Sequence, residues 1–92
     1  MKEKQIVNQI RQALKDRGFW VVKIHGGMYQ MSGLPDLLAI RDGRAYWFEV
    51  KTPKGKVSRL QEEIIKELRS FGCTAEVVRS REEAVSYVEA KM

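Results

Sequence analysis

Hydrophobic side chains recur with helical spacing in the first part of the chain. Ile6, Ile10 and Leu14 are each four residues apart, which places them on one side of a helix. The pattern predicts an amphipathic helix over residues 2–16, and Gly18 is expected to end it.

The next apolar segments are typical of strands. Residues 19–24 are rich in aromatic and β-branched side chains. Two further apolar runs flank Asp42-Gly43, a dipeptide that favours a tight two-residue hairpin. Between the strand over 19–24 and this hairpin, residues 25–35 contain three glycines and a proline, so we expect an irregular loop with a functional role.

The C-terminal part alternates again between helix and strand. After a short basic loop at residues 52–56, the pattern predicts a helix over 58–71, a strand over 75–78 and a helix over 80–90. Ser58 with Gln61, and Ser80 with Glu83, have the spacing of capping boxes at the two helix starts.

These elements follow one another in the order αβββαβα, which indicates an α/β fold. The helix over 58–71 can cross over between two parallel strands, so the four-stranded sheet is expected to be mixed. Both faces of the hairpin are apolar, so helices should flank both faces of the sheet. One face holds Leu38, Ile40 and Trp47, and the other holds Leu37, Ala39, Tyr46 and Phe48. Trp20 and Trp47 are expected to be core residues.

The hairpin also brings charged residues together. With Asp42 and Gly43 as the loop, Asp36 lies opposite Glu49, and Lys51 emerges on the same face as Glu49. Facing carboxylates destabilise a sheet, so we expect them to have another role. Two carboxylates and an ammonium group could bind a hard divalent cation and activate a water molecule. Alternatively, this is an ordinary hairpin whose solvated acids pair with Lys51.

Length and composition narrow the class of protein. The 92 residues are enough for one domain, which we expect to span residues 1–92. The formal net charge of +5 favours a polyanionic partner such as nucleic acid. The lone Cys73 excludes an internal disulfide, and no segment has the pattern of a membrane span or a signal peptide. We therefore expect a soluble, cytoplasmic protein.

Three further residues allow both a structural and a functional role. Glu3 lies at the outer end of the apolar stripe, where a first-turn acid also complements the helix dipole. Gln61 lies in the helix that starts a short loop after Lys51, and the capping box alone would explain why a glutamine is present there. His25, the only histidine, could bind metal or DNA, or be exposed without a specific role.

The residues Pro35-Asp36, Glu49-x-Lys51 and Gln61, in this element order, resemble the PD-(D/E)XK nuclease superfamily. Together with Glu3, the segments GLPD (33–36) and EVK (49–51) are similar to those of a stand-alone VRR-NUC domain of the viral and bacterial type. The resemblance covers nearly the whole chain and implies a restriction-endonuclease-like fold.

The resemblance also implies roles for individual residues. Asp36, Glu49 and the carbonyl group of Val50 would bind Mg²⁺, or Mn²⁺ in its place, with Glu3 approaching the same site from the first helix. Lys51 would orient or help to deprotonate the attacking water and stabilise charge on the phosphate. Gln61 would position the lysine, a water molecule or the substrate phosphate.

DNA binding is expected to involve basic residues close to this site. Lys54, Lys56 and Arg59 form a cluster after the second hairpin strand, and Tyr29 and Gln30 in the long loop could touch a DNA strand. Lys23 and Arg41 are further candidates. A solvated basic face is the alternative for the cluster.

The resemblance implies a metal-dependent DNA endonuclease that hydrolyses phosphodiester bonds in structured DNA, such as a branched junction or a flap. Proteins with this minimal fold resemble Holliday junction resolvases and often act as homodimers, here in a bacterial or phage-infected cell. Two alternatives are a nicking nuclease that needs partner subunits and a catalytically silent DNA-binding or scaffolding module.

Overall fold

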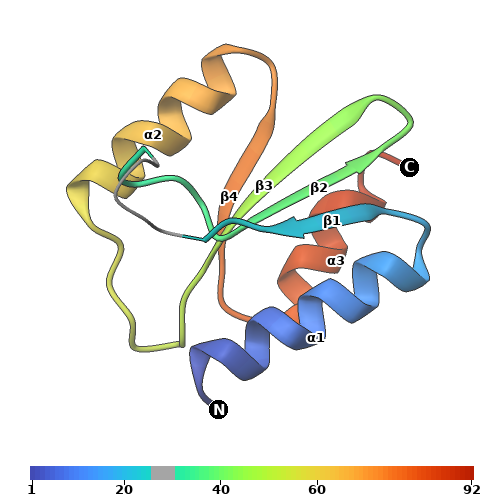
Figure 1. The fold of residues 1–92 in the computed structure, drawn as a ribbon, viewed down its shortest axis with the longest axis horizontal. Helices are drawn as coiled ribbons and strands as arrows, with labels where there is room; N and C mark the ends of the chain where they lie inside the picture. The colour runs from blue at the N-terminus through green and yellow to red at the C-terminus, as the bar shows by residue number, and fades with distance from the viewer. Residues whose placement is uncertain (26–30) are drawn as a thin grey trace.

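The computed structural model describes residues 1–25 and 31–92, and the elements of this part follow the predicted order αβββαβα (Figure 1). The elements are α1 (Glu3–Asp16), β1 (Trp20–Lys23), β2 (Leu37–Arg41), β3 (Arg44–Val50), α2 (Arg59–Ser70), β4 (Thr74–Val78) and α3 (Arg81–Glu89). The bounds of α1, β1, α2, β4 and α3 each lie within one residue of the predicted ranges.

The four strands form one mixed sheet in the order β1-β2-β3-β4. β1 and β3 each pair antiparallel with β2, and β3 pairs parallel with β4 across the α2 connection. The predicted hairpin register is confirmed from Arg41 opposite Arg44 to Leu37 opposite Phe48. Asp42 and Gly43 both have positive φ angles, 52° and 76°, as a two-residue hairpin loop of this twist requires.

The main core lies on one face of the sheet, beneath α1 and α3. These two helices contact each other, and Figure 1 shows them on the same side of the strands. Inward-facing side chains of β2, β3 and β4 alternate with outward-facing ones and pack against the apolar stripe of α1. The buried cluster comprises Ile6, Val7, Ile10, Leu14, Phe19, Leu37, Ala39, Tyr46, Phe48, Val50, Val78, Ala84 and Val88.

The opposite face is only partly covered. α2 packs there against β4, and Ile65 is its one fully buried residue. The prediction that Trp20 is a core residue is wrong, because α2 does not extend over β1 and Trp20 is 60% exposed. Trp47, on the central strand β3, is half-buried.

The helix starts follow the capping pattern, with one difference. At α2, Ser58 and Gln61 bond reciprocally, as predicted. At α3, the Ser80 hydroxyl accepts from the Glu83 backbone N–H at 3.1 Å, but the Glu83 carboxylate accepts from the backbone N–H of Arg79 at 2.9 Å. Only the return bond of the second capping box is therefore displaced by one residue, from Ser80 to Arg79. No helix in the described ranges has the length and apolar character to cross a membrane.

Candidate active site

Asp36 lies where three strands meet, directly before β2. Its Oδ2 accepts a hydrogen bond of 2.8 Å from the backbone N–H of Val50, across the hairpin. Its carbonyl oxygen accepts a 2.8 Å bond from the N–H of Ile24, just beyond β1. The carboxylate is thus fixed to the end of β3, next to Glu49.

Gly33 allows the chain before Asp36 to lie against α2. Its φ angle is +87°, and a Cβ atom there would lie 2.8 Å from Cγ of Leu60 and 3.1 Å from Cγ1 of Ile64. Any other residue would be strained in this conformation and would clash with α2. The glycine of the GLPD segment therefore sets the approach of the chain to Asp36.

Glu49 is the buried acid of the site, with 2% of its surface exposed. Its Oε2 accepts from Nε2 of Gln61 at 3.3 Å and lies 3.6 Å from Nζ of Lys51. Its Oε1 is also buried, and no described residue bonds to it.

Burial raises the pKa of Glu49 to about 8, and the negative charge of Asp36 contributes the next part of this rise. A side-chain hydrogen bond with Asp36, which needs a proton on one of the two carboxyl groups, also raises this pKa, Lys51 opposes the shift, and Glu3 adds the smallest part. The carboxyl group therefore holds its proton far more tightly than an exposed glutamate does.

Lys51 follows β3, and both its backbone and its side chain have bonding partners. Its backbone N–H donates to the carbonyl of Val78 at 3.0 Å, which continues the parallel pairing of β3 with β4. Its half-buried ammonium group faces Glu49. The acid–lysine pairing expected for an ordinary hairpin is present, but Glu49 is buried, whereas that alternative requires a solvated acid.

Gln61 makes the capping contact that the sequence predicts and a second contact, to Glu49, that it does not predict. Its Oε1 accepts from the backbone N–H of Ser58 at 3.0 Å, as a capping residue does, while its Nε2 donates to Glu49. The start of α2 is therefore tied directly to the acidic site.

Glu3 has a weaker connection to this site. It is exposed in the first turn of α1, and its charge is the last of those that influence the pKa of Glu49. In the described residues, no group of three or more His, Cys, Asp or Glu side chains is close enough to hold a metal ion. Metal binding by Glu3 remains a prediction.

Without Glu3, the oxygen donors that remain at this site still fit a hard divalent cation. Asp36 and Glu49 supply carboxylate oxygens, and the buried Oε1 of Glu49 has an unused acceptor site. The carbonyl oxygen of Val50 is the third oxygen donor of the predicted set. A cation would also offset the burial and the negative charge of Asp36, which together raise the pKa of Glu49.

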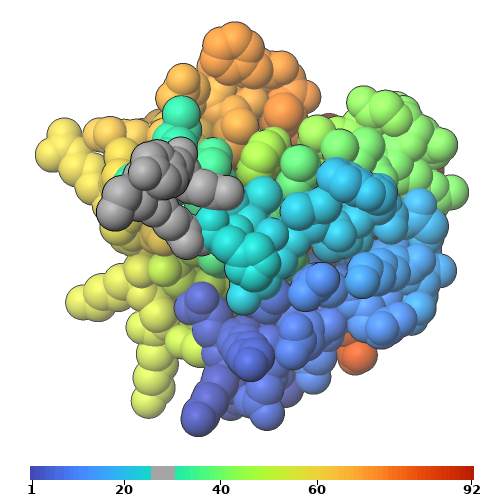
Figure 2. Space-filling view, viewed as in Figure 1, coloured from blue at the N-terminus to red at the C-terminus, as the bar shows by residue number. Residues whose placement is uncertain are grey.

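The residues predicted to contact DNA differ from one another in exposure and in bonding partners. Lys54 and Lys56 are exposed between β3 and α2, and Figure 2 shows this yellow-green segment at the outer edge of the molecule. Arg59 is exposed and pairs with Glu63 at 3.3 Å. Tyr29 and Gln30 lie outside the described residues.

Three other residues that were candidates for binding DNA or metal lie in different parts of the structure. Lys23 is half-buried in β1 and His25 is exposed. Arg41 lies at the hairpin loop, five residues along β2 from Asp36 and thus roughly 17 Å from it. It donates to the carbonyl of Arg17 at 3.0 Å, so its DNA contact is the least supported.

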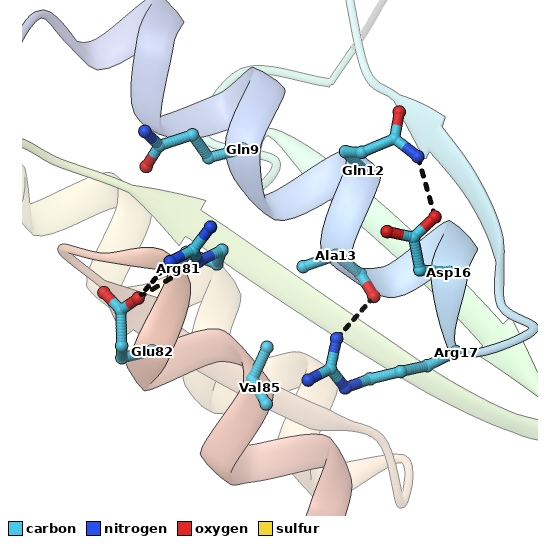
Figure 3. A pocket seen from close by; sticks show the side chains of 8 residues that line it. All are labelled: Gln9, Gln12, Ala13, Asp16, Arg17, Arg81, Glu82 and Val85. Atoms are coloured by element: carbon cyan, nitrogen blue, oxygen red, sulfur yellow. Dashed lines mark hydrogen bonds and ion pairs between the residues drawn. The ribbon is translucent and has the colours of Figure 1, made fainter.

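A polar groove of about 470 Å³ between α1 and α3 is separate from these residues (Figure 3). Its polar and charged side chains bond to one another or to backbone, as Gln12 does to Asp16 at 2.8 Å and Arg17 to the carbonyl of Ala13 at 2.9 Å. The paired carboxylates are not part of its lining, so it offers no comparable chemistry.

Sequence reasoning did not identify Arg79. This residue follows β4 and binds backbone carbonyl groups of the segment after Lys51. No sequence pattern indicates the role of this arginine, because its partners are backbone atoms that are distant in the sequence.

Paired carboxylates and a lysine at the end of this hairpin, on an αβββαβα sheet, define a nuclease domain of the PD-(D/E)XK superfamily. The chain belongs to the archaeal Holliday junction resolvase (Hjc) family, whose model matches residues 2–91. It is also similar to a solved structure described as a VRR_NUC domain, with 25% sequence identity and a TM-score of 0.80. That match covers 95% of this chain and 94% of the other. A comparison with curated proteins gave no match. Together, the family and the fold suggest a nuclease that acts on structured DNA.

Proposed function

We propose that this chain is a Mg²⁺- or Mn²⁺-dependent endodeoxyribonuclease that hydrolyses phosphodiester bonds in branched DNA. The observation that carries the proposal is the buried Glu49 carboxylate, which has one oxygen without a partner among the described residues and lies beside Asp36 and Lys51. Such an arrangement is costly for folding alone, and it fits a site whose missing positive charge arrives with the substrate complex.

A divalent cation held by Asp36, Glu49 and the Val50 carbonyl, with Glu3 approaching from α1, would neutralise charge on the phosphate and acidify the attacking water. Glu49 must lose its proton to serve as a ligand, and the Gln61 amide holds its Oε2 in place. The Lys51 ammonium group, fixed beside the same carboxylate, donates to the developing charge on the phosphate and orients the water.

Branched DNA is the proposed substrate because the chain belongs to the archaeal Holliday junction resolvase family. The seven elements of the described part all belong to one sheet and its helices, without a separate DNA-reading unit. Lys54, Lys56 and Arg59 would bind phosphates, and Tyr29 and Gln30 would contact a strand near the branch. Phosphate contacts fix the position of the protein without reading bases, which fits recognition of shape.

We further propose that the protein acts as a homodimer, since two sites are needed to cut two strands of a junction. The two-fold pairing of identical surfaces is the commonest form of association. This would also place two basic segments on one substrate.

The testing experiment compares cleavage of a four-way junction, a flap, single-stranded DNA and linear duplex, each with Mg²⁺, Mn²⁺ or EDTA. Metal-dependent cleavage of junction or flap in preference to duplex is expected. Metal-dependent nicking only after a partner subunit is added would favour the nicking nuclease. Tight binding without cleavage under any condition would favour the silent DNA-binding module.

A further inference from the structure

Arg79 joins the end of β4 to a turn formed by residues 52–55. Its Nη1 donates to the carbonyl oxygens of Thr52 at 2.6 Å and Gly55 at 2.7 Å, and lies 3.4 Å from that of Pro53. Among the described residues it forms no ion pair with an acid, so its charge is directed at the three carbonyl groups. Charge-assisted hydrogen bonds of this kind are stronger than neutral ones.

The turn itself is tight and lies against Lys51. The Gly55 N–H donates to the Thr52 carbonyl at 3.0 Å. A Cβ atom on Gly55 would lie 3.3 Å from Oγ1 of Thr52 and 3.4 Å from Cβ of Lys51. Lys54 is within this turn and Lys56 follows it directly, and both side chains are exposed.

Arg79 has a firm position from which to hold the turn. Its backbone N–H donates to the Glu83 carboxylate in α3, and the preceding Val78 carbonyl accepts from the N–H of Lys51. The guanidinium group therefore links an exposed basic turn to both the sheet and α3.

We propose that Arg79 is a positioning residue for DNA binding, which orders the turn at residues 52–55 and so presents Lys54 and Lys56 to the DNA backbone. The inference rests on the proposed function. A turn that is already ordered loses less conformational entropy when its lysines bind phosphate, which increases affinity. Lys51 keeps its own bonds to Val78 and Glu49, so Arg79 affects affinity more than the chemical step.

The first test compares Arg79→Gln with Arg81→Gln. Arg81 is two residues away, exposed, and paired with Glu82 at 3.0 Å, so its variant removes the same charge without touching the turn. In EDTA, Arg79→Gln should weaken binding of a labelled four-way junction about fivefold to tenfold, and Arg81→Gln less than about twofold. At saturating junction with metal, the single-turnover rate of Arg79→Gln should fall less than about threefold. A rate loss equal to or larger than the affinity loss would overturn the proposal.

A double-mutant cycle separates positioning from direct contact. If Arg79 acts through the two lysines, Arg79→Gln should cause no further loss of affinity in the Lys54→Ala/Lys56→Ala background. The dependence of log Kd on log salt should also become shallower in both Arg79→Gln and the lysine double variant. Additive losses would mean that Arg79 binds phosphate itself, and would contradict the positioning role.

A measurement without DNA tests the turn alone. Amide hydrogen exchange of Gly55 should become faster in Arg79→Gln and stay unchanged in Arg81→Gln, because only the first variant releases the turn. If the wild type binds or cleaves no DNA, the proposed function fails, while the exchange rates still report on the turn. Unchanged Gly55 exchange in an active Arg79→Gln protein would overturn only the role of Arg79. If Arg79→Gln does not fold, the same comparisons apply to Arg79→Lys and Arg81→Lys, with smaller changes in the same direction.

Discussion

At the scale of single residues, burial and charge oppose each other most strongly at Glu49. One carboxylate oxygen is bonded to Gln61 and faces Lys51, and the other is buried without a partner in the described chain. Buried acceptors without a partner are uncommon in folded proteins. We therefore propose that Glu49 is a metal ligand rather than part of the framework.

The raised pKa of Glu49 predicts how stability depends on pH in the metal-free protein. Its folded-state pKa of about 8 lies above the ordinary value of 4.5. The folded state therefore binds one more proton than the unfolded state between these values, and stability falls as pH rises through this window. The slope from one such group is at most about 1.4 kcal/mol per pH unit. Glu49→Gln, which cannot ionise, should flatten the dependence.

Urea unfolding in EDTA at pH 5 to 8.5, followed by tryptophan fluorescence, measures this difference. Glu62→Gln, at an exposed site in the first turn of α2, should follow the wild-type curve. A Glu49→Gln variant that loses stability with pH as steeply as the wild type would show that Glu49 is already ionised when folded.

Lys51→Ala should abolish cleavage and leave junction binding nearly intact. Its ammonium group is half-buried beside Glu49, and the proposed function has it act there on charge that develops in the transition state. The single-turnover rate should fall about a hundredfold or more, as for the loss of a catalytic proton donor or charge stabiliser. Lys66→Ala, an exposed lysine on α2, is the matched control. A Lys51→Ala protein within a few-fold of the wild-type rate would exclude the lysine from the mechanism.

At the scale of elements, patterns that depend on neighbouring residues were the most predictable. The Asp42-Gly43 dipeptide predicts the hairpin register, and that register alone places Asp36 and Glu49 at the same end of the hairpin. The α2 capping box was also predictable, because its partners are three residues apart.

Features that depend on how elements cover one another were less predictable. Trp20 is a large aromatic residue of a kind usually found in a core. Its exposure depends on how far α2 extends over the sheet, which the sequence does not show. Arg79 bonds to carbonyls more than 20 residues away, and backbone acceptors carry no signal in the sequence. The packing of Gly33 on α2 likewise became visible only in three dimensions.

Asp36→Asn tests the end of the hairpin. Asparagine can still accept the hydrogen bond from Val50, and it removes the charge that faces Glu49. In EDTA above pH 8, where Glu49 is ionised as well as Asp36, the variant should melt no lower than the wild type, because facing like charges cost about 0.2–1 kcal/mol in a sheet. With Mg²⁺ or Mn²⁺ the order should reverse, since a ligand that binds only the folded state raises its stability.

Asp42→Asn at the other end of the same hairpin is the control for these melts. Asn tolerates the positive φ of 52° there, so this variant should gain as much from metal as the wild type does. If Asp36→Asn is destabilised in EDTA and still responds fully to metal, Asp36 has a structural role only.

At the scale of the whole molecule, charge and apolar surface are separated. Of the exposed basic residues proposed to bind DNA, Lys54 and Lys56 lie between β3 and α2, and Arg59 is the first residue of α2. The outer sheet face beside β1 is apolar, with Trp20 exposed and Val22, Leu38 and Ile40 half-buried around it. We refer to these four residues as the outer apolar face.

The outer apolar face is the surface that we expect a second copy of the chain to cover. It can pair with itself about a two-fold axis, and β1 is an edge strand whose free side could approach the partner. Light scattering should show a dimer with and without junction DNA, and Trp20→Glu should convert it to a monomer, because the new charge would be buried in the interface. Since Trp20 is exposed in the single chain, the variant should keep the fold. Phe71→Glu, at an 82% exposed position at the end of α2, should remain dimeric. Dissociation by Phe71→Glu alone would move the interface to α2, and a wild type that stays monomeric on junction DNA would refute the homodimer.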